Sequence, residues 1–350
     1  MSFLLYGANG YTGQLIARYA KDAGLSPMLA GRSEQKIKDL AGGLSCPWRS
    51  FSLSEAEKLE AALREVPVVL HAAGPFIHTA RPMMQACLRT GTHYLDITGE
   101  MAVFEMAYRF DEKAKKAGVM LMPGAGFDVV PTDCLALHLK NRLPDATHLR
   151  LAFGTLGSRV SHGTAMTMVE NLGEEGAVRK DGKIVRVPLG HKTLRFPGGD
   201  KSLFAMTIPW GDVSTAYRTT GIPNIEVYMS VTPSAHRQVK WNRYLGWLLR
   251  TEFVKNIARR KIAQRPAGPS DTQRAGSRSF LWGEVRNERW QIRQAVLTTP
   301  DGYTLTAMTS LLILEKVLSS NLKTGFQTPA GAYGEDLILE AEGTERRDLP

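Results

Sequence analysis

Short apolar runs alternate with amphipathic segments over the first third of the chain. Ser2–Tyr6 is apolar without polar alternation, which is typical of a strand buried on both faces of a parallel sheet. A glycine-rich turn follows it, and Gln14–Ala20 has the pattern of a helix. The same alternation predicts further strands at Pro27–Ala30, Cys46–Phe51, Val66–Ala73, His93–Ile97 and Val119–Met122. Six strands with helices between them predict an α/β fold with a doubly wound parallel sheet over residues 1–130.

Local end signals place the helices between these strands. Ser54–Glu57 has the spacing of a capping box, which would open a helix running to Arg64. Arg81–Thr90 is expected to be helical, with Pro82 tolerated in its first turn. A further helix is expected to run to about Ala117.

The turn after the first strand has the glycine spacing of a dinucleotide-binding corner. Gly7 allows a tight turn, Gly10 lets the backbone approach a pyrophosphate, and Gly13 lets the helix pack closely on the strand. An ordinary glycine-rich turn is the alternative, but the strand before it and the helix after it favour the cofactor site. The expected cofactor residues here are Gly7, Asn9, Gly10, Tyr11, Thr12 and Gly13.

The end of the second strand decides which dinucleotide is expected. Where an NAD site would have an acidic residue for the ribose hydroxyl, the chain has Arg32 and Ser33, with Lys36 one helical turn later. A guanidinium pairs with a 2′-phosphate, and an acidic side chain would repel it. NADP is therefore favoured over NAD, although Arg32 could also simply begin a solvated helix.

A second turn of small residues follows the fourth strand. Small side chains there would let the nicotinamide half of the cofactor lie across the strand ends. The expected contacts are Ala73, Gly74, Pro75 and Phe76.

Length and composition bound the class of protein. With 350 residues, the chain is long enough for two domains, and no apolar run reaches the length needed to cross a bilayer. The first ten residues leave no room for a signal peptide. Its three cysteines are far apart and form no CxxC pair, which argues against disulfides and zinc. We expect no metal site, and we expect the protein to be a homo-oligomer in the cytoplasm.

The net charge of +10 is unevenly spread. Residues 131–300 carry 26 Lys and Arg against 13 Asp and Glu, whereas residues 1–130 are nearly balanced. The basic excess points to an anionic partner or surface met by the second domain. Nucleic acid is not expected, because no recognised reading motif accompanies the charge.

One basic stretch, residues 236–265, holds nine Lys and Arg and one acidic residue. Its pattern predicts a basic amphipathic helix or helix pair, which could lie on an anionic membrane or guide an acyl chain. Equally, its apolar stripe could pack on the second domain. Its apolar residues are Trp241, Tyr244, Leu245, Trp247, Leu248, Phe253, Val254 and Ile257.

The segment after it is expected to be irregular before regular structure resumes. Pro266–Arg278 is rich in Pro, Gly, Ser and Arg and predicts a mobile loop, of a length often found in lids. Ser279–Arg286 and Arg289–Leu297 then have the pattern of two strands joined through Asn287 and Glu288.

Seven motifs, most of them turns, follow one another along the chain: GANGYTG (7–13), AGRS (30–33), HAAGPF (71–76), GTHYLDITGE (91–100), PGAGFDVVPTD (123–133), DGYTLTAM (301–308) and GFQTPAGAYG (325–334). In this order they resemble the saccharopine dehydrogenase-like NADP-binding oxidoreductases, and more closely the bacterial branch that includes trans-acting enoyl reductases. Over residues 165–265 the resemblance is thin.

The resemblance implies a Rossmann-type NADP-binding domain and a second α/β substrate domain. We place the substrate domain at residues 131–300 and expect residues 301–350 to pack back on the first domain. One departure concerns His162, which stands in a Ser-His-Gly-Thr turn where relatives are expected to have glycine.

Candidate proton donors come from loops at the strand ends. Glu100 follows the fifth strand and Asp128 follows the sixth, so either carboxylate could serve near the nicotinamide. His162 is a third candidate, because an ordinary histidine titrates near pH 6.5. Capping is the alternative for Asp128 and for the nearby Asp133, and simple solvation is the alternative for His162.

The sequence lacks the motifs of three other enzyme classes. No Tyr is followed four residues later by Lys, so a short-chain dehydrogenase is disfavoured, and there is no HExxH or nucleophile elbow. We expect an NADP-dependent oxidoreductase that reduces a C=C, C=O or C=N bond of an apolar, lipid-like or acyl-type substrate. The alternative is a non-catalytic nucleotide-binding protein that acts as a membrane-associated scaffold or sensor.

Overall fold

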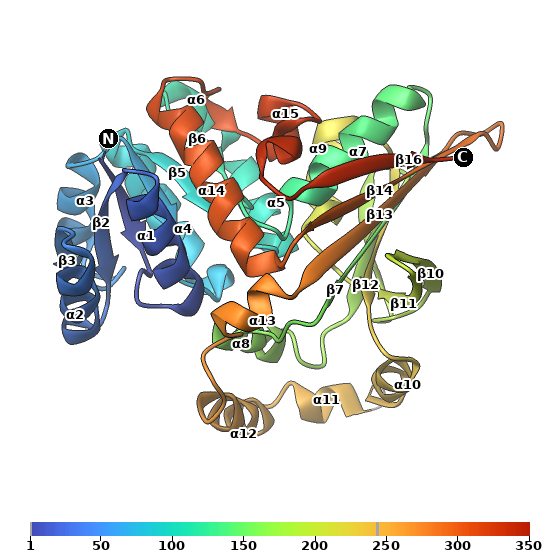
Figure 1. The fold of residues 1–350 in the computed structure, drawn as a ribbon, viewed down its shortest axis with the longest axis horizontal. Coiled ribbons are helices and arrows are strands. Elements are labelled where there is room, and N and C mark those ends of the chain that lie inside the picture. The colour runs from blue at the N-terminus through green and yellow to red at the C-terminus, as the bar shows by residue number, and fades with distance from the viewer. Residues whose placement is uncertain (1, 243–244) are drawn as a thin grey trace. The chain divides into compact units, whose positions relative to one another are not determined.

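The computed structural model describes residues 2–242 and 245–350. The chain forms two compact units, coloured along the sequence in Figure 1. The first contains the chain up to Val130 together with Tyr303–Ala332, and the second contains Pro131–Gly302 together with Tyr333–Pro350. Each unit has a β-sheet of its own.

The sheet of the first unit is entirely parallel, with strand order β15-β6-β5-β4-β1-β2-β3. Leaving β15 aside, the chain leaves β1 in one direction to β2 and β3 and returns to β4 on its other side, which is the doubly wound arrangement that the sequence predicts. The fold class is therefore confirmed. The strands are β1 (Ser2–Tyr6), β2 (Ser26–Gly31), β3 (Trp48–Ser50), β4 (Val68–His71), β5 (His93–Asp96), β6 (Met120–Met122) and β15 (Gly325–Phe326).

Helices connect these strands, and two of them begin where the sequence did not place them. The helices of this unit are α1 (Tyr11–Asp22), α2 (Glu34–Leu44), α3 (Ala56–Arg64), α4 (Phe76–Thr90), α5 (Met101–Arg109), α6 (Asp111–Lys116), α14 (Gly302–Leu318) and α15 (Pro329–Tyr333). The capping box at Ser54 is wrong, because the Glu55 carboxylate instead accepts the backbone N–H of Ser52 at 2.7 Å. Pro82 lies inside α4 and not in its first turn.

The prediction of a single helix running to about Ala117 is also wrong. The chain breaks at Phe110 into α5 and α6. The Asp111 side chain at the start of α6 accepts the backbone N–H of Phe326 at 2.8 Å, and β15 lies next to β6 in the sheet. The break therefore serves a strand that arrives from much later in the chain.

Helix α14 packs against the first unit, as expected for the segment after residue 300. Its Tyr303 ring meets the Tyr11 ring of α1 edge to face, with the centroids 5.1 Å apart. The Thr309 hydroxyl donates to the Ala125 carbonyl at 3.0 Å, and the Thr306 hydroxyl accepts the Phe127 N–H at 3.0 Å. Helix α14 thus holds the turn after β6 in place.

The second unit is built on a mixed sheet with the order β10-β11-β12-β7-β13-β14-β16. The predicted hairpin is present, with Trp282 opposite Val296 in its register. The strands are β7 (His148–Leu156), β8 (Gly176–Lys180), β9 (Lys183–Val187), β10 (Thr193–Gly198), β11 (Lys201–Thr207), β12 (Asn224–Ser230), β13 (Arg278–Arg286), β14 (Ile292–Pro300) and β16 (Glu345–Leu349).

The end of the chain differs from the expectation for residues 301–350. Strand β16 pairs with β14 of the second unit. Its Asp348 accepts hydrogen bonds from the His138 Nε2–H at 2.6 Å and the Arg142 Nε–H at 2.7 Å, both on α7 (Val130–Arg142). Side-chain partners about 200 residues away hold this tail, which is why its own pattern does not reveal its place.

The segment between β12 and β13 is more regular than expected. Pro266–Arg278 contains the short helix α13, whose N-cap Ser270 forms a true capping box with Gln273. The basic stretch forms three helices, and residues 243 and 244 within it lie outside the described residues. The helices of this unit after α7 are α8 (His162–Glu170), α9 (Asp212–Thr220), α10 (Pro233–Asn242), α11 (Gly246–Leu249), α12 (Glu252–Ala263), α13 (Asp271–Ala275) and the 3-10 turn η2 (Leu337–Glu340).

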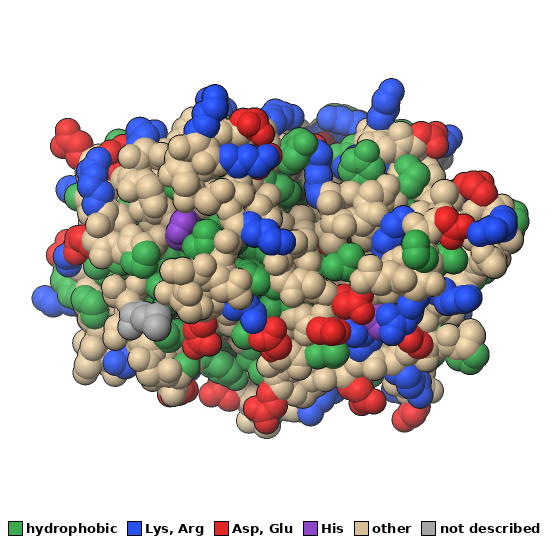
Figure 2. All heavy atoms as spheres, turned by 90° about the horizontal axis from the view of Figure 1, so that it is seen from above, with side chains coloured by type: hydrophobic (Ala, Val, Ile, Leu, Met, Phe, Trp, Pro, Cys, Tyr) green, Lys and Arg blue, Asp and Glu red, His purple; other side chains and the backbone are tan. Residues whose placement is uncertain are grey.

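The part of the chain that the structure describes has neither a membrane-spanning helix nor a cluster of metal ligands. None of its helices combines the length and the apolar character needed to cross a bilayer. Within the same residues, no three His, Cys, Asp or Glu side chains are grouped so that they could hold a metal ion. On the face shown in Figure 2, acidic and basic side chains are interspersed, so the net charge is not gathered there.

The close packing of α1 on the turn after β1 can be tested with Gly13→Ala. A methyl group at Gly13 would lie 2.3 Å from the Gly7 carbonyl oxygen and 2.9 Å from the Ala8 Cα, so helix and turn must separate. We expect the free energy of unfolding to fall by about 3 kcal/mol, measured by denaturant unfolding.

Gly42→Ala is the matched control. Gly42 lies in α2 with nothing within 4 Å of an added Cβ, and alanine favours a helix. A gain of about 0.5–1 kcal/mol is expected there. Equal stability of the two variants would contradict the packing argument.

Candidate active site

The turn between β1 and α1 brings backbone unusually close to backbone. Gly7 has a φ of +87°, and a Cβ on it would lie 2.7 Å from the Ala73 nitrogen. The N–H groups of Gly7 and Ala8 both donate to the Ala30 carbonyl, at 2.8 and 3.1 Å, which closes the turn against β2. The corner is therefore shaped by absent side chains, as the glycine spacing predicts.

The N-terminus of α1 faces outward from this corner. Its N-cap is Gly10, and among the residues that the structure describes no side chain caps the helix there. The first turn contains no acidic residue. A helix end of this kind presents backbone N–H groups and the positive end of the helix dipole to an anion. These features fit the pyrophosphate of a dinucleotide.

Arg32 follows β2 and is exposed. It makes no hydrogen bond or ion pair with any described residue, so its guanidinium is available to a phosphate. Ser33 is the N-cap of α2, and its hydroxyl does not cap that helix within the described chain. Gly31 leaves room for the Asn9 side chain, since an added Cβ would lie 2.8 Å from Asn9 Oδ1. These features are compatible with the extra phosphate of NADP.

A buried histidine supports the turn Ala73–Phe76. His71 Nε2–H donates to the Thr79 hydroxyl at 3.0 Å, and that hydroxyl donates to the Ala73 carbonyl at 2.7 Å. Burial lowers the pKa of His71 to about 3, so the ring is neutral at physiological pH. The Phe76 ring stands edge-on to the His71 ring, with the centroids 5.4 Å apart. His71 thus positions the turn that is expected to meet the nicotinamide half of the cofactor.

Glu100 has a structural partner in this turn. Its two carboxylate oxygens accept the backbone N–H groups of Phe76 at 2.7 Å and Ile77 at 2.9 Å. These amides begin α4, so Glu100 caps that helix from a distant strand end. This contact also explains why α4 begins at Phe76, before the predicted Arg81.

Two carboxyl groups near the ends of β5 and β6 have raised pKa values. Burial raises the pKa of Asp128 to about 7, and the negative charge of Glu100 adds to the effect. Burial also raises the pKa of Asp96 to about 7, against the hydrogen bonds that it accepts from the Tyr94 hydroxyl and from the N–H groups of Thr98 and Gly124. Asp96 ties β5 to the turn after β6. Asp128 lies in that turn and is partly exposed.

The other two candidates lie in the second unit. His162 begins α8, and its Nε2–H donates to the Arg265 carbonyl at 2.7 Å, while its backbone N–H donates to Ala267. Asp133 is buried in the first turn of α7 and accepts the Thr219 hydroxyl at 2.6 Å. Both contacts hold neighbouring segments together. Within the first unit, the structure brings Glu100 and Asp128 to the same strand ends as the cofactor loops.

Sequence reasoning missed His71 and Asp96 as site residues. Both are the last residue of a strand in the structure, His71 of β4 and Asp96 of β5, whereas the predicted strands run on to Ala73 and Ile97. A polar residue closing an apolar strand at the ligand-binding edge of a parallel sheet is the signal that could have found them.

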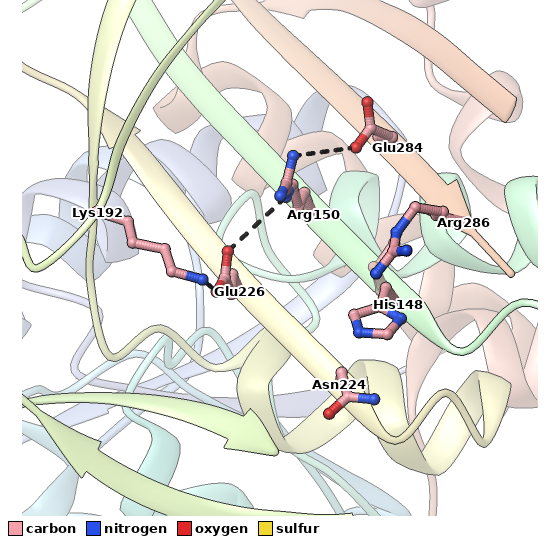
Figure 3. A pocket seen from close by; sticks show the side chains of 8 residues that line it. His148, Arg150, Lys192, Asn224, Glu226, Glu284 and Arg286 are labelled. Carbon is pink, nitrogen blue, oxygen red and sulfur yellow. Dashed lines mark hydrogen bonds and ion pairs between the residues drawn. The ribbon is translucent and has the colours of Figure 1, made fainter. Parts of the chain in front are cut away.

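A cavity of about 200 Å³ lies on one face of the second unit's sheet, over β12, β7 and β13 (Figure 3). Side chains at alternate positions of adjacent strands point to the same face, and the register places Glu226 and Glu284 on either side of Arg150. The lining residues are His148, Leu149, Arg150, Lys192, Asn224, Glu226, Glu284 and Arg286.

Both carboxylates of this cavity are paired with cations. Arg150 reaches Glu284 at 3.3 Å and Glu226 at 3.8 Å, and Lys192 pairs with Glu226 (Figure 3). Burial alone would raise the pKa of Glu226, but its hydrogen bonds to Lys192 and Tyr228 hold the value below the usual range. This cluster is an ion-pair network that stabilises the sheet face.

We predict that Arg150→Met lowers the melting temperature by about 3 °C, equivalent to about 1 kcal/mol, because two mostly buried carboxylates lose a shared cation. Because Glu226 has a lowered pKa in the folded protein, its ionised form stabilises the fold above the pKa of the unfolded state. This stabilisation is lost as the pH falls. The difference from the natural protein should therefore shrink as the pH falls below the ordinary glutamate pKa of 4.5.

Arg186→Met is the control for Arg150→Met, with the melting temperatures of both variants measured by calorimetry. Arg186 and its partner Glu175 are both exposed and 3.6 Å apart, so no measurable change is expected. A loss as large as that of Arg150→Met would show that removing any arginine destabilises this unit.

The segment that contains this corner is similar to a known protein family. Residues 3–122 match the family described as "Saccharopine dehydrogenase NADP binding domain". A "Lipid droplet localized protein" of Caenorhabditis elegans is 26% identical over 330 residues, covering 80% of this chain and 77% of that protein. A "Trans-acting enoyl reductase" of Mycobacterium leprae (strain TN) is 32% identical over 148 residues, covering 40% of this chain and 35% of that protein.

A solved structure supports the fold over the whole chain. Saccharopine dehydrogenase (L-Glu forming) from Saccharomyces cerevisiae covers 100% of both chains with a TM-score of 0.69 at 14% identity. At that identity the likeness concerns the fold. The family match also confirms NADP as the expected cofactor. Residues 3–122 are thus similar to the saccharopine dehydrogenase NADP-binding domain, and the fold of the chain is similar to that of a saccharopine dehydrogenase.

Proposed function

We propose that the chain is an NADP-dependent oxidoreductase that reduces a C=C, C=O or C=N bond of an apolar or acyl-type substrate. The observation that carries this proposal is the corner formed by the start of α1, which no described side chain caps, and Arg32, which forms no hydrogen bond or ion pair with a described residue. NADPH bound there supplies a hydride. The protein then has to orient the substrate, provide a proton and exclude water.

The cofactor residues proposed from the sequence act through distinct means. The glycines let backbone approach the phosphates, Arg32 neutralises the 2′-phosphate, and the turn from Ala73 to Phe76 receives the nicotinamide half. The fixed geometry of this turn, held by His71 and Glu100, supports that role. The full set is Gly7, Asn9, Gly10, Tyr11, Thr12, Gly13, Arg32, Ser33, Ala73, Gly74, Pro75 and Phe76.

Asp128 is our proposed proton donor. A carboxyl group with a pKa of about 7 is half protonated at neutral pH, which suits a general acid. Glu100 contributes indirectly, because its charge disfavours ionisation of Asp128 while its oxygens cap α4. His162 is a second proposed proton donor, in the substrate domain. Its Nε2–H donates to the Arg265 carbonyl in the structure.

The substrate class rests on chemistry and on relatives. One relative is described as an enoyl reductase and another as localised to lipid droplets. We therefore place an acyl or lipid-like substrate in this protein as well. The proposal includes peripheral contact with a lipid surface through residues 236–265, on the cytoplasmic side of the inner membrane, and a homo-oligomeric state.

A non-catalytic nucleotide-binding scaffold is the second candidate, favoured by the exposed aromatic side chains of the basic stretch. Turnover separates the two. Oxidation of NADPH in the presence of enoyl, keto and imine substrates of increasing chain length is expected for an oxidoreductase. Tight NADPH binding without turnover on the whole panel would favour the scaffold.

We predict that Arg32→Gln weakens NADPH binding about 10- to 100-fold while leaving NADH binding unchanged, because only NADPH carries the phosphate that Arg32 meets. Fluorescence titration of the bound nicotinamide measures both constants. Arg18→Gln is the control, because Arg18 is an exposed arginine of α1 that is not a predicted cofactor residue. This variant should bind both cofactors as the natural protein does. Equal losses for both cofactors would reject the assigned role.

We predict that Asp128→Asn lowers turnover about 100-fold without changing NADPH affinity. In the natural protein the reductive rate should fall as the pH rises above about 7, because the donor loses its proton. The exposed Asp22→Asn on α1 serves as control. Retained turnover in Asp128→Asn would exclude Asp128 as the acid.

The same raised pKa gives a readout that does not need the substrate. The stabilising contribution of protonated Asp128 is full below its ordinary pKa of 3.8 and is lost as the pH rises through about 7. Between these values the natural protein should lose more melting temperature than Asp128→Asn. Parallel curves for the two proteins would contradict the raised pKa.

A further inference from the structure

We infer that helices α10–α12 form a docking surface for an anionic lipid surface. The basic arm, defined as residues 233–242 and 245–263, would lie flat on that surface with its aromatic side chains inserted. This inference rests on the lipid contact included in the proposed function and names the side chains that make it. It concerns a surface of the second unit only.

The arm exposes large apolar side chains. Trp241 is 74% exposed, Trp247 is 72% exposed and Phe253 is 74% exposed. None of the three has a ring or cation contact with a described residue. Leu245, Leu248 and Ile257 are also exposed. Solitary exposed apolar residues are ordinary, but a series of them along consecutive helices marks an interaction surface.

The opposite side of the arm is firmly attached to α8. Ile262 and Ala258 pack with Ala165 and Val169. Around this apolar contact, Arg259 and Lys255 both bond to one residue of α8, Glu170, through its side chain at 2.7 Å and its carbonyl at 2.9 Å, respectively. The arm is therefore a fixed platform, and its exposed residues are not the underside of a detached helix.

The spacing along α12 separates an inner stripe from an outer stripe. Lys255, Ala258, Arg259 and Ile262 follow the i, i+3, i+4, i+7 pattern of one helix face, and these are the residues that contact α8. Phe253 and Ile257 are four residues apart on another face, and Arg260 and Lys261 continue that face one turn later. The outward face of α12 is thus apolar at its start and basic at its end.

Helix α10 also has a buried anchor and exposed basic and aromatic residues. Its buried His236 anchors the helix through a hydrogen bond from Nε2–H to the Gly190 carbonyl at 2.9 Å. Arg237 and Trp241, four residues apart, are both exposed. Figure 1 shows α12, α11 and α10 following one another along one edge of this unit. The exposed aromatic residues therefore belong to three helices that follow one another along this edge.

The charges of the arm select an anionic partner. Arg237, Lys240, Arg260 and Lys261 are exposed, and none pairs with a carboxylate among residues 2–242 and 245–350. The arm's own acidic residue, Glu252, is paired with Arg259 at 2.8 Å. Cations mixed with tryptophans are the composition of helices that lie at a membrane interface. The helices are too short to span a bilayer, so the arm would rest in the headgroup region.

The test uses the full-length protein and vesicles of phosphatidylcholine with or without phosphatidylglycerol, in a flotation assay. We expect flotation with the anionic vesicles and about tenfold less with phosphatidylcholine alone or at high salt. The triple variant Trp241→Ala, Trp247→Ala, Phe253→Ala should reduce partitioning at least tenfold. Because all three side chains are exposed, its melting temperature should stay within 1–2 °C of the natural value, roughly the limit expected for surface changes.

Two further variants make the result specific. Trp290→Ala removes an equally exposed tryptophan, 72%, from the turn between β13 and β14 and should float normally. Replacing Arg237, Lys240, Arg260 and Lys261 with Gln should abolish the preference for phosphatidylglycerol. No flotation, or equal flotation of the triple variant, would overturn the inference.

A second copy of the chain is the competing occupant. If the natural protein is an oligomer and the triple variant a monomer in light scattering without vesicles, the surface is a subunit interface and the inference fails. NADPH titration and turnover on soluble short-chain substrates are run in parallel. Failure of docking leaves these unchanged, whereas failure of the reductase proposal leaves flotation unchanged, so the two are distinguishable.

Discussion

The contact on which the first unit depends is the approach of α1 to the turn after β1. There is no room for a single methyl group between Gly13 and the Gly7 carbonyl. This contact fixes where α1 begins relative to the end of β1, at the edge of the sheet where β2 and β4 also end. No described side chain caps this helix end, and together with Arg32 after β2 it forms the corner that we propose for the phosphates.

The alternating part of the fold could be predicted because its signals are local. A buried parallel strand is apolar throughout, so β1, β4 and β6 declare themselves over a few residues. The parts that could not be predicted depend on distant partners. Strand β15 has two residues and exists because β6 offers an edge, and β16 is held by the side chains of α7. No window of the sequence contains both halves of such a contact.

The candidate site divides along the same line. Glycine spacing and Arg32 are readable because the backbone shape and the phosphate charge each require one residue type at one position. The supporting residues are not, since Glu100 reaches amides 24 residues away and Asp96 reaches one 28 residues away. These contacts also produce the chemistry of the site. Burial raises the pKa of Asp128 to about 7, and the charge of Glu100, which these contacts hold nearby, adds to the effect.

The basic stretch shows why amphipathicity alone did not decide between packing and lipid contact. Its sequence contains enough apolar residues for both, and the structure assigns them to different faces. Small side chains such as Ala258 fill the interface with α8, together with Ile262, whereas the aromatic ones face solvent. Burying the aromatics inward would have given the larger apolar contact within the chain. The chain instead packs small residues against α8 and pairs Arg259 with Glu170, which leaves the aromatic rings exposed, together with cations that have no carboxylate partner among the described residues. Such a division makes physical sense when a second apolar and anionic phase meets the outer face.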